Sequence, residues 1–288
     1  MKKMSKQLLA FFATVIIFSV PLAENNMDFF LNSFAQAPSS SANQTLSARL
    51  PGSPQLDFRP DLSASQKNAS VDGTCTLVST STKLHRTPQQ TEGPYFVDGM
   101  PNRSDIRSDT SNGLLQQGIP LSLVIRVYDV DNGSCLPIKG AKVDIWHANS
   151  GGVYSAVNDM GTNGKNFLRG YQVTDNNGTV RFTTIYPGWY PGRAIHIHDK
   201  IRTFNGSVNT LEWTAQLYSN NTMNEQIHEQ TPYSSHGPPQ TLNEEDMIYT
   251  GASTDGLVRT NSGNWLVMNV TKDGSTYLGT FNIVLDVQ

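Results

Sequence analysis

Short runs of alternating apolar and polar residues, separated by turn signals, limit the fold of this chain more than any other feature. The clearest run is "YLGTFNIVLDV" (277–287), which follows the turn signal "KDG". "LSLVIRVYDV" (121–130) alternates in the same way and leads into the turn signal "DNGS". Successive side chains of a strand point to opposite faces, so a period of two predicts strands with one buried face.

Five further short runs have strand character, and no segment has a convincing helical pattern. These runs are 142–148, 178–188, 194–198, 211–219 and 264–270. Seven short strands with Asn/Asp-Gly turns predict an all-β fold, a β-sandwich of the immunoglobulin or prealbumin type. The long connections 155–170 and 219–262 are expected to be irregular, and loops of that length in a compact domain are often functional.

The N-terminal residues predict export. Residues 1–6 are basic, and the apolar run "LLAFFATVIIFSVPLA" (8–23) is short for a membrane span. We expect a signal peptide at 1–23, with "AQA", ending at residue 37, as a later cleavage site and an uncleaved anchor as the alternative. The expected location is therefore secreted, periplasmic or attached to the cell envelope.

The composition divides the rest of the chain into a tether and one domain. Residues 24–74 are rich in Ser, Asn, Gln, Ala and Pro and lack periodicity, which is typical of a flexible segment. Residues 75–288 contain all of the expected strands and form the predicted sandwich domain. An apolar content of 37% is enough for one substantial core, and the oligomeric state is left open.

Charge and cysteines exclude some functions. The formal charge of −3 becomes −6 when Lys2, Lys3 and Lys6 leave with the signal peptide, which argues against a nucleic-acid partner. Cys75 and Cys135 are the only cysteines, and an even count in an exported chain favours a disulfide. A metal site at these cysteines is the weaker interpretation, because neither lies in a CxxC pattern or beside a histidine.

"AIHIH" (194–198) indicates a metal site on a strand. Residues i and i+2 of a strand lie about 6–7 Å apart on one face, so His196 and His198 can converge on one ion. By itself the pair is a weak indicator, because alternating histidines are often only exposed or hydrogen-bonded.

Tyrosines are the remaining donors near this pair. Asp199 falls on the opposite face from His198, and His228 and His236 lie in a long predicted loop. Tyr190 precedes the histidines in "PGWY", and Tyr154 ends "SGGVY". A bound cation can remove the proton of a phenol, and the resulting hard anionic oxygen suits Fe(III) better than Zn(II) or Cu(I).

Four segments together carry a resemblance to a known family. They are "TPQQTEGPYFVDGMPNRSDIR" (87–107), "VDIWHANSGGVYS" (143–155), "LRGYQVTDNNGTVRFTTIYPGWY" (168–190) and "GRAIHIHDK" (192–200). In this order they resemble the intradiol ring-cleavage dioxygenases, most of all the exported members related to the protocatechuate 3,4-dioxygenase branch. The resemblance covers roughly residues 75–287.

The resemblance implies a role for each site residue. The non-haem Fe(III) ligands would be Tyr154, Tyr190, His196 and His198, and Tyr190 would be the ligand that leaves when substrate binds. Arg193 would stabilise negative charge on the substrate, and Gln216 would lie just outside the ligands. Residues 91–96 would lie over the site, and Tyr95 and Trp146 match positions near the pocket that are equally typical of core residues. No role is implied for His147.

The implied activity is cleavage of a catechol between its two hydroxylated carbons with O2, which gives a muconate-type diacid. The separation of Tyr190 and His196 is shorter than in the protocatechuate enzymes, so a more open pocket is expected, partly filled by Trp189. Two alternatives remain at this point. One is a non-catalytic secreted module that binds an aromatic or sugar ligand, and the other is a Zn or Cu protein built on the two histidines.

Overall fold

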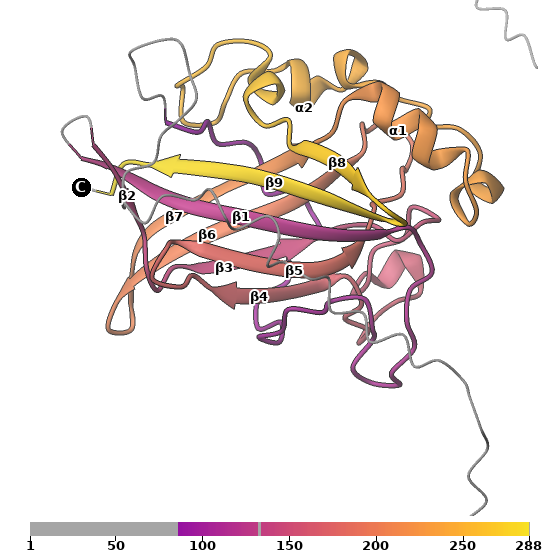
Figure 1. The fold of residues 1–288 in the computed structure, drawn as a ribbon, viewed down its shortest axis with the longest axis horizontal. Helices are drawn as coiled ribbons and strands as arrows, with labels where there is room; N and C mark the ends of the chain where they lie inside the picture. Colours follow the sequence, from indigo (N-terminus) through magenta and orange to yellow (C-terminus); the bar gives the residue numbers. More distant parts are fainter. Residues whose placement is uncertain (1–85, 132–133, 288) are drawn as a thin grey trace, which may run out of the picture. The chain divides into compact units, whose positions relative to one another are not determined.

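The computed structural model describes residues 86–131 and 134–287, which form two β-sheets packed face to face (Figure 1). The predicted all-β sandwich is therefore confirmed. The first sheet has the order β2-β1-β9-β8, with β5 also paired to β1. Its strands are β1 (Pro120–Asp131), β2 (Ser134–Pro137), β5 (Thr179–Ile185), β8 (Asn269–Asp273) and β9 (Thr276–Leu285). The second sheet has the order β4-β3-β6-β7, with β3 (Lys142–Trp146), β4 (Arg169–Val173), β6 (His196–Asn205) and β7 (Val208–Tyr218).

The first and last strands predicted from alternation are neighbours in the first sheet. β1 and β9 pair in parallel, in a register that runs from Leu121 opposite Tyr277 to Asp129 opposite Leu285. The other edge of β1 pairs with β5 along its first half and with β2 along its second half. Because parallel neighbours need a long connection, nearly the whole domain lies between these two strands.

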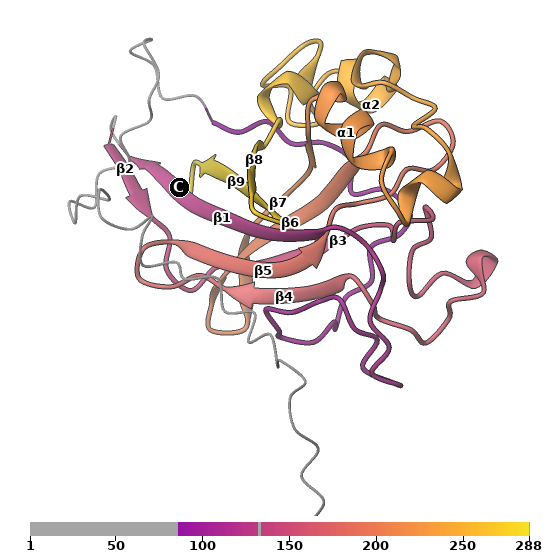
Figure 2. The same ribbon diagram turned by 45° about the vertical axis from the view of Figure 1, so that its right-hand side comes forward.

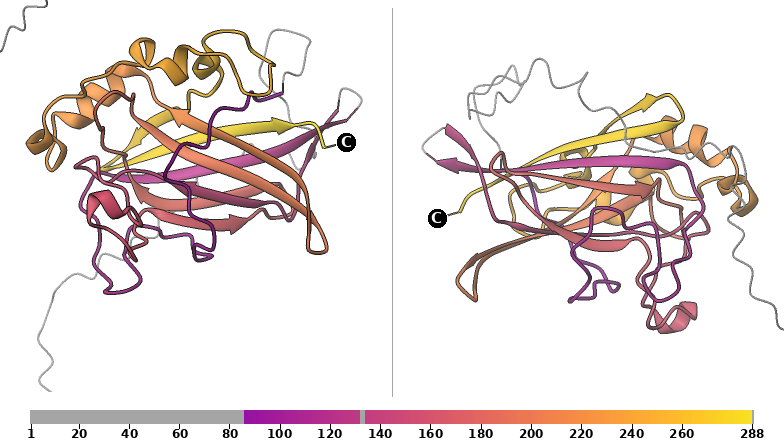
Figure 3. Two further views of the ribbon diagram at one scale, coloured as in Figure 1. Left: turned by 180° about the vertical axis from the view of Figure 1, so that it is seen from behind. Right: turned by 60° about the horizontal axis from the view of Figure 1, so that its bottom comes forward.

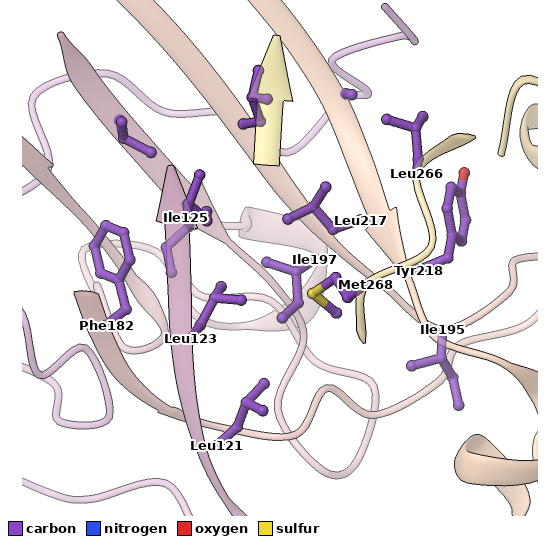
Figure 4. Packing of buried hydrophobic residues seen from close by; sticks show 14 of the residues in the cluster. Leu121, Leu123, Ile125, Phe182, Ile195, Ile197, Leu217, Tyr218, Leu266 and Met268 are labelled. Atoms are coloured by element: carbon purple, nitrogen blue, oxygen red, sulfur yellow. The ribbon is translucent and has the colours of Figure 1, made fainter. Parts of the chain in front are cut away.

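The core lies between the two sheets. The predicted face of β1 is fully buried, from Leu121 through Leu123 and Ile125 to Val127. Figure 4 shows Leu121, Leu123 and Ile125 of β1 directed toward Ile197 of β6 and Leu217 of β7. Burial of each large aliphatic side chain stabilises the fold by about 1.5–3 kcal/mol. Because Ile197 occupies the inner face of β6, the residues on either side of it point outward.

One predicted strand is largely wrong. In the run 264–270, Ser262–Trp265 form a 3-10 helix, and β8 begins only at Asn269. Leu266 and Met268 are buried, which explains the alternation, but the segment makes a single bridge to Tyr218 rather than a ladder. The alternation of apolar residues in this segment therefore indicates buried side chains, but not pairing into a sheet.

The connection 219–268 is more ordered than the sequence predicted. It contains α1 (Asn221–His228) and the single turn α2 (Met247–Thr250), and Figure 2 shows both helices on the same side of the sandwich. The side chain of Asn220 accepts a hydrogen bond of 2.8 Å from the Met223 amide and so caps α1. The strands β2 and β4 were also missed, because each has only four or five residues and no clear alternation. None of the described helices is long and apolar enough to cross a membrane.

Residues 90–98, called the cover segment below, cross the outer face of β6 and β7 (Figure 3, left). Two ion pairs attach the segment to β6. Glu92 lies 2.5 Å from the Nζ of Lys200, and Asp98 lies 2.9 Å from the guanidinium of Arg202. The cover segment includes all of "TEGPYF" (91–96), which was expected above the site.

Several predictions fall outside the described residues. The signal peptide (1–23), the tether (24–74) and Cys75 all lie in that part of the chain. Cys135 is buried in β2, and its disulfide with Cys75 stays a prediction.

Candidate metal centre

Two histidines and two tyrosines meet at one point on the outer face of β6. The Nε2 atom of His196 lies 3.0 Å from the Nε2 atom of His198 and 3.4 Å from the hydroxyl oxygens of both Tyr154 and Tyr190. Donor atoms that lie about 2.0–2.1 Å from a shared ion are about 3–3.4 Å apart. The separations around His196 are therefore those of donors that can share one ion.

The phase of β6 explains why the two histidines face the same way. Ile195 and Ile197 enter the core, so His196 and His198 point outward. The Nδ1 atom of His196 lies 2.6 Å from the carbonyl oxygen of Ala194, which places the ring proton on Nδ1. The lone pair of its Nε2 atom is then free to bind a metal, as in most metal-binding histidines.

Aromatic side chains hold the donors from the outside. The indole of Trp146 stacks on the ring of His198, with centroids 4.8 Å apart and planes 5° apart. Phe96 of the cover segment packs on Trp146, and the ring of Tyr95 lies 4.7 Å from that of Tyr154. Tyr95 and Trp146 thus both lie against the donors.

Gly93 lets the cover segment approach His198 closely. A Cβ atom on Gly93 would lie 3.2 Å from Cε1 of His198, and the φ of +75° there disfavours any other residue. Steric constraints therefore explain why "TEGPYF" has a glycine at position 93.

The loops that carry the two tyrosines pack backbone against backbone through glycines. A Cβ atom on Gly152 would lie 2.3 Å from the carbonyl oxygen of Trp189. A Cβ atom on Gly188 would lie 2.2 Å from the carbonyl oxygen of Asn149. The glycines of "SGGVY" and "PGWY" thus allow the two loops to meet.

Arg193 lies beside Tyr190 in a hydrogen-bonded network. Its Nη1 donates to the Tyr190 hydroxyl at 3.4 Å, and its Nη2 donates to the side-chain oxygen of Gln216. Gln216 also accepts from the hydroxyl of Tyr218 at 3.1 Å and donates to the carbonyl oxygen of Thr91 at 3.1 Å. Gln216 therefore joins Arg193 to the cover segment.

Asp246 is a component of the site that the sequence did not indicate. It is fully buried and accepts from Nε of Arg193 at 3.0 Å and from the Ala194 amide at 2.8 Å. It also caps α2 by accepting from the Ile248 amide at 2.7 Å. A helix-start pattern at "DMIYT" could have suggested the cap, but nothing in the sequence connects it with Arg193, 53 residues earlier.

We expect Asp246→Asn to slow the ring cleavage that the sequence resemblance implies by about 10–100-fold, while the visible absorption of the Fe(III)-loaded protein stays unchanged. The substitution removes the charge that orients Arg193, and it leaves the four donors in place. Steady-state kinetics and the visible spectrum measure the two effects. Asp105→Asn is the matched control, because it breaks an exposed Asp–Arg pair with Arg107. Equal activity of the two variants would contradict a role for Asp246 in orienting Arg193.

Burial sets the protonation of the donors. It lowers the pKa of His196 to about 3, with the positive charge of Arg193 acting in the same direction, and it lowers the pKa of His198 well below its usual value. Burial also raises the pKa of Tyr190 above the usual value for a phenol, and it raises the pKa of Tyr154 well above that value. The imidazoles are therefore neutral and ready to bind, whereas each phenol needs a cation to displace its proton.

The other histidines of the described chain do not add to this donor set. The Nε2 of His147 lies 2.7 Å from the Thr184 hydroxyl, and its Nδ1 lies 2.9 Å from the Ala148 carbonyl. His228 ends α1 and bonds the Asn224 carbonyl at 2.8 Å. Within residues 86–131 and 134–287 no group of three or more His, Cys, Asp or Glu is arranged to hold a metal.

A donor set of two imidazoles and two phenols fits ferric iron better than zinc.

Trp189 was expected to fill part of the substrate pocket, but it packs elsewhere. Its indole donates to the carbonyl oxygen of Gly237 at 2.9 Å, and its ring lies 4.4 Å from that of His236. It packs with the sandwich core, whereas the adjacent Tyr190 packs with the aromatic cluster around Tyr154. The two neighbours point to opposite sides of the loop.

Comparison with known proteins agrees with this site. A family model described as "Dioxygenase" matches residues 91–207, which contain all four donors. The catechol 1,2-dioxygenase of Acinetobacter baylyi is 37% identical over 109 residues, which are 36% of this chain and 32% of that protein. The solved structure of an intradiol ring-cleavage dioxygenase from Tetranychus urticae is 32% identical, with a TM-score of 0.59. That match covers 70% of this chain and 95% of the other.

The class that the fold and the comparisons define is a β-sandwich dioxygenase. The chain belongs to the intradiol ring-cleavage dioxygenase family. Its matches to the first two curated relatives span only 32% and 46% of their lengths. The placement nearer to the protocatechuate branch stays a prediction.

Proposed function

We propose that this protein is a non-haem Fe(III) dioxygenase that cleaves catechols between their two hydroxylated carbons with O2 and gives muconate-type diacids. The observation that carries the proposal is the meeting of Tyr154, Tyr190 and His198 around the Nε2 atom of His196. Family membership and the similarity to catechol 1,2-dioxygenases support it. Both atoms of O2 enter the product, so the reaction needs no external reductant.

The two tyrosines differ in a way that suits substrate entry. Tyr154 is fully buried, while Tyr190 is only partly buried. Tyr190 is therefore the donor that can move aside, and its oxygen can take a proton from a catechol hydroxyl. Tyr154 stays in place.

Arg193 is placed to act on the substrate. Its Nη1 lies 3.4 Å from the Tyr190 oxygen, so it is also close to any catechol oxygen that replaces Tyr190. A fixed guanidinium there stabilises negative charge that develops during the reaction. Gln216 and Asp246 hold Arg193 from two sides and keep this orientation without rearrangement.

Ferric iron held by the four donors would supply Lewis acidity toward both catechol oxygens and would draw electron density from the ring, which opens the ring to attack by O2. The aromatic side chains of Trp146, Phe96 and Tyr95 exclude water from one side of this centre.

The charges near the site favour a catechol without an acidic substituent. Lys200 pairs with Glu92, Arg202 pairs with Asp98, and Arg193 pairs with Asp246. Arg169 has no such pair among the described residues, but it is buried and its guanidinium is bonded to Ser155 and Tyr95, so it does not line the wall. A carboxylate on the ring would need an unpaired cation in the wall. The proposal therefore includes a preference for catechol over protocatechuate. It also includes an exported location, which the sequence of the N-terminal segment predicts.

Loading the purified protein with Fe(III) tests the proposal. The expected result is a burgundy protein, because tyrosinate-to-Fe(III) charge transfer absorbs visible light, with a band that shifts when catechol is added anaerobically. O2 uptake should then be faster with catechol than with protocatechuate or hydroxyquinol. A protein that stays colourless with Fe(III) but binds Zn(II) or Cu(II) would instead support a histidine-based site of another kind.

A further inference from the structure

Arg169 is a buried cation that has no carboxylate partner among the described residues. Its side chain is among the largest fully buried ones, with 1% of the residue exposed. Within the part of the chain that the structure describes, its guanidinium donates only to neutral oxygens: the Ser155 carbonyl at 2.7 Å, the Ser155 hydroxyl at 2.9 Å and the Tyr95 carbonyl at 2.6 Å. No ion pair joins it to any acidic residue of the described chain.

Two other arginines near the site, Arg193, which is partly buried, and Arg202, which is buried, are paired with carboxylates. Arg193 pairs with Asp246, and Arg202 pairs with Asp98 and Asp144. Buried charges that lack a counter-charge are costly, and proteins seldom keep them. An unbalanced guanidinium therefore calls for an anion that is present in the working protein.

The group that faces Arg169 is the ring of Tyr154. The guanidinium carbon lies 5.9 Å from the centroid of this ring. Although burial lowers the pKa of Arg169 to about 10, the side chain remains charged at neutral pH. Its hydrogen bonds to Ser155 and Tyr95 hold the residue that follows Tyr154 and the aromatic residue that packs on it.

We infer that Arg169 is a positioning residue that acts through Tyr154: its charge balances the anionic oxygen that Tyr154 presents to the metal, and its hydrogen bonds fix the Tyr154 loop to the cover segment. The inference rests on the proposed function, because Tyr154 is anionic only when it binds a cation. Charge and hydrogen bonding can be separated experimentally, since lysine keeps the charge and loses the planar arrangement of donors.

A double-mutant cycle on Fe(III) affinity tests the inference. Arg169→Met should weaken Fe(III) binding at least tenfold when Tyr154 is present, and less than threefold in the Tyr154→Phe background. In the iron-loaded protein, Arg169→Met should also move the charge-transfer band to longer wavelength, because loss of a positive charge near the phenolate raises the energy of its donor orbital. Arg169→Lys should leave the band near its original wavelength.

Arg103→Met is the matched control. Arg103 also bonds backbone carbonyls, those of Ser108, Asn166 and Arg169, but its charge lies near Asp105 and Asp109. This control should leave the band unmoved. Arg169→Gln serves as the neutral variant if Arg169→Met does not yield folded protein.

Three results would overturn the inference. The first is an equal loss of Fe(III) affinity from Arg169→Met with and without the Tyr154 hydroxyl, and the second is a weaker band with no change of wavelength in the neutral variants. The third is a wild-type protein that forms no coloured Fe(III) complex, which overturns the proposed function as well. A coloured wild-type protein with either of the first two results overturns the role of Arg169 alone.

Discussion

Tyr154→Phe should weaken Fe(III) binding and slow ring cleavage by more than ~100-fold. Outer residues that only orient metal ligands contribute about 10–100-fold, so loss of a donor atom itself should exceed that range. The phenyl ring can keep its packing against Tyr95 and the aromatic cluster, so the variant should remain folded. Absorption per bound iron should fall, because only Tyr190 then donates charge to the metal.

Tyr186→Phe is the matched control for this substitution. Tyr186 is also fully buried, and its hydroxyl donates to the side chain of Asn224 at 2.7 Å, within the sandwich core. The control should lose about 1 kcal/mol of stability and keep its iron and its activity. If Tyr154→Phe bound iron and cleaved catechol as well as Tyr186→Phe does, Tyr154 would not be a ligand.

Gly152→Ala should destabilise the protein and disturb both tyrosine loops. A φ of +79° costs an L-residue about 1–2 kcal/mol, and a contact of 2.3 Å with the Trp189 carbonyl adds an overpacking cost of about 1–3 kcal/mol. The melting temperature should fall by roughly 5–15 °C, as measured by calorimetry. Because Trp189 precedes Tyr190, Fe(III) affinity should fall as well.

Gly151→Ala is the matched control for Gly152→Ala. It tests whether any alanine substitution in this loop destabilises the protein. Its Cβ atom would meet only the Asn149 side chain, at an ordinary distance of 3.6 Å. The two variants differ by one position and carry the same added methyl group. A melting temperature of Gly152→Ala equal to that of Gly151→Ala would show that the two loops do not depend on their close backbone contact.

The sandwich was predictable because its core uses simple alternation. The odd positions of 121–127 are buried, and those of 277–287 are buried or packed against the core, on the faces that their spacing predicted. The same reasoning failed at 264–270, where Leu266 and Met268 are buried without a strand ladder. It also missed α1, because a helix of eight residues with a polar N-cap gives little periodic signal.

The candidate site was predictable only in part. His196 and His198 follow from the period of a strand, and the two tyrosines came from the order of four motifs. Asp246 and Arg169 could not be predicted, because their roles depend on contacts between distant segments. Asp246 bonds Arg193 from a distant part of the long connection 219–268. Nothing in the sequence around Arg169 indicates that it has no carboxylate partner among residues 86–131 and 134–287.

The most direct test of the account is the product that the Fe(III)-loaded protein forms from catechol in ¹⁸O2, analysed by mass spectrometry. The expected product is a muconate-type diacid that carries oxygen from O2 in its carboxyl groups, formed more than ~100-fold more slowly by the Tyr154→Phe variant. A semialdehyde, which would place the cleavage beside rather than between the hydroxylated carbons, would contradict it. So would unchanged catechol in the presence of the coloured, fully loaded protein.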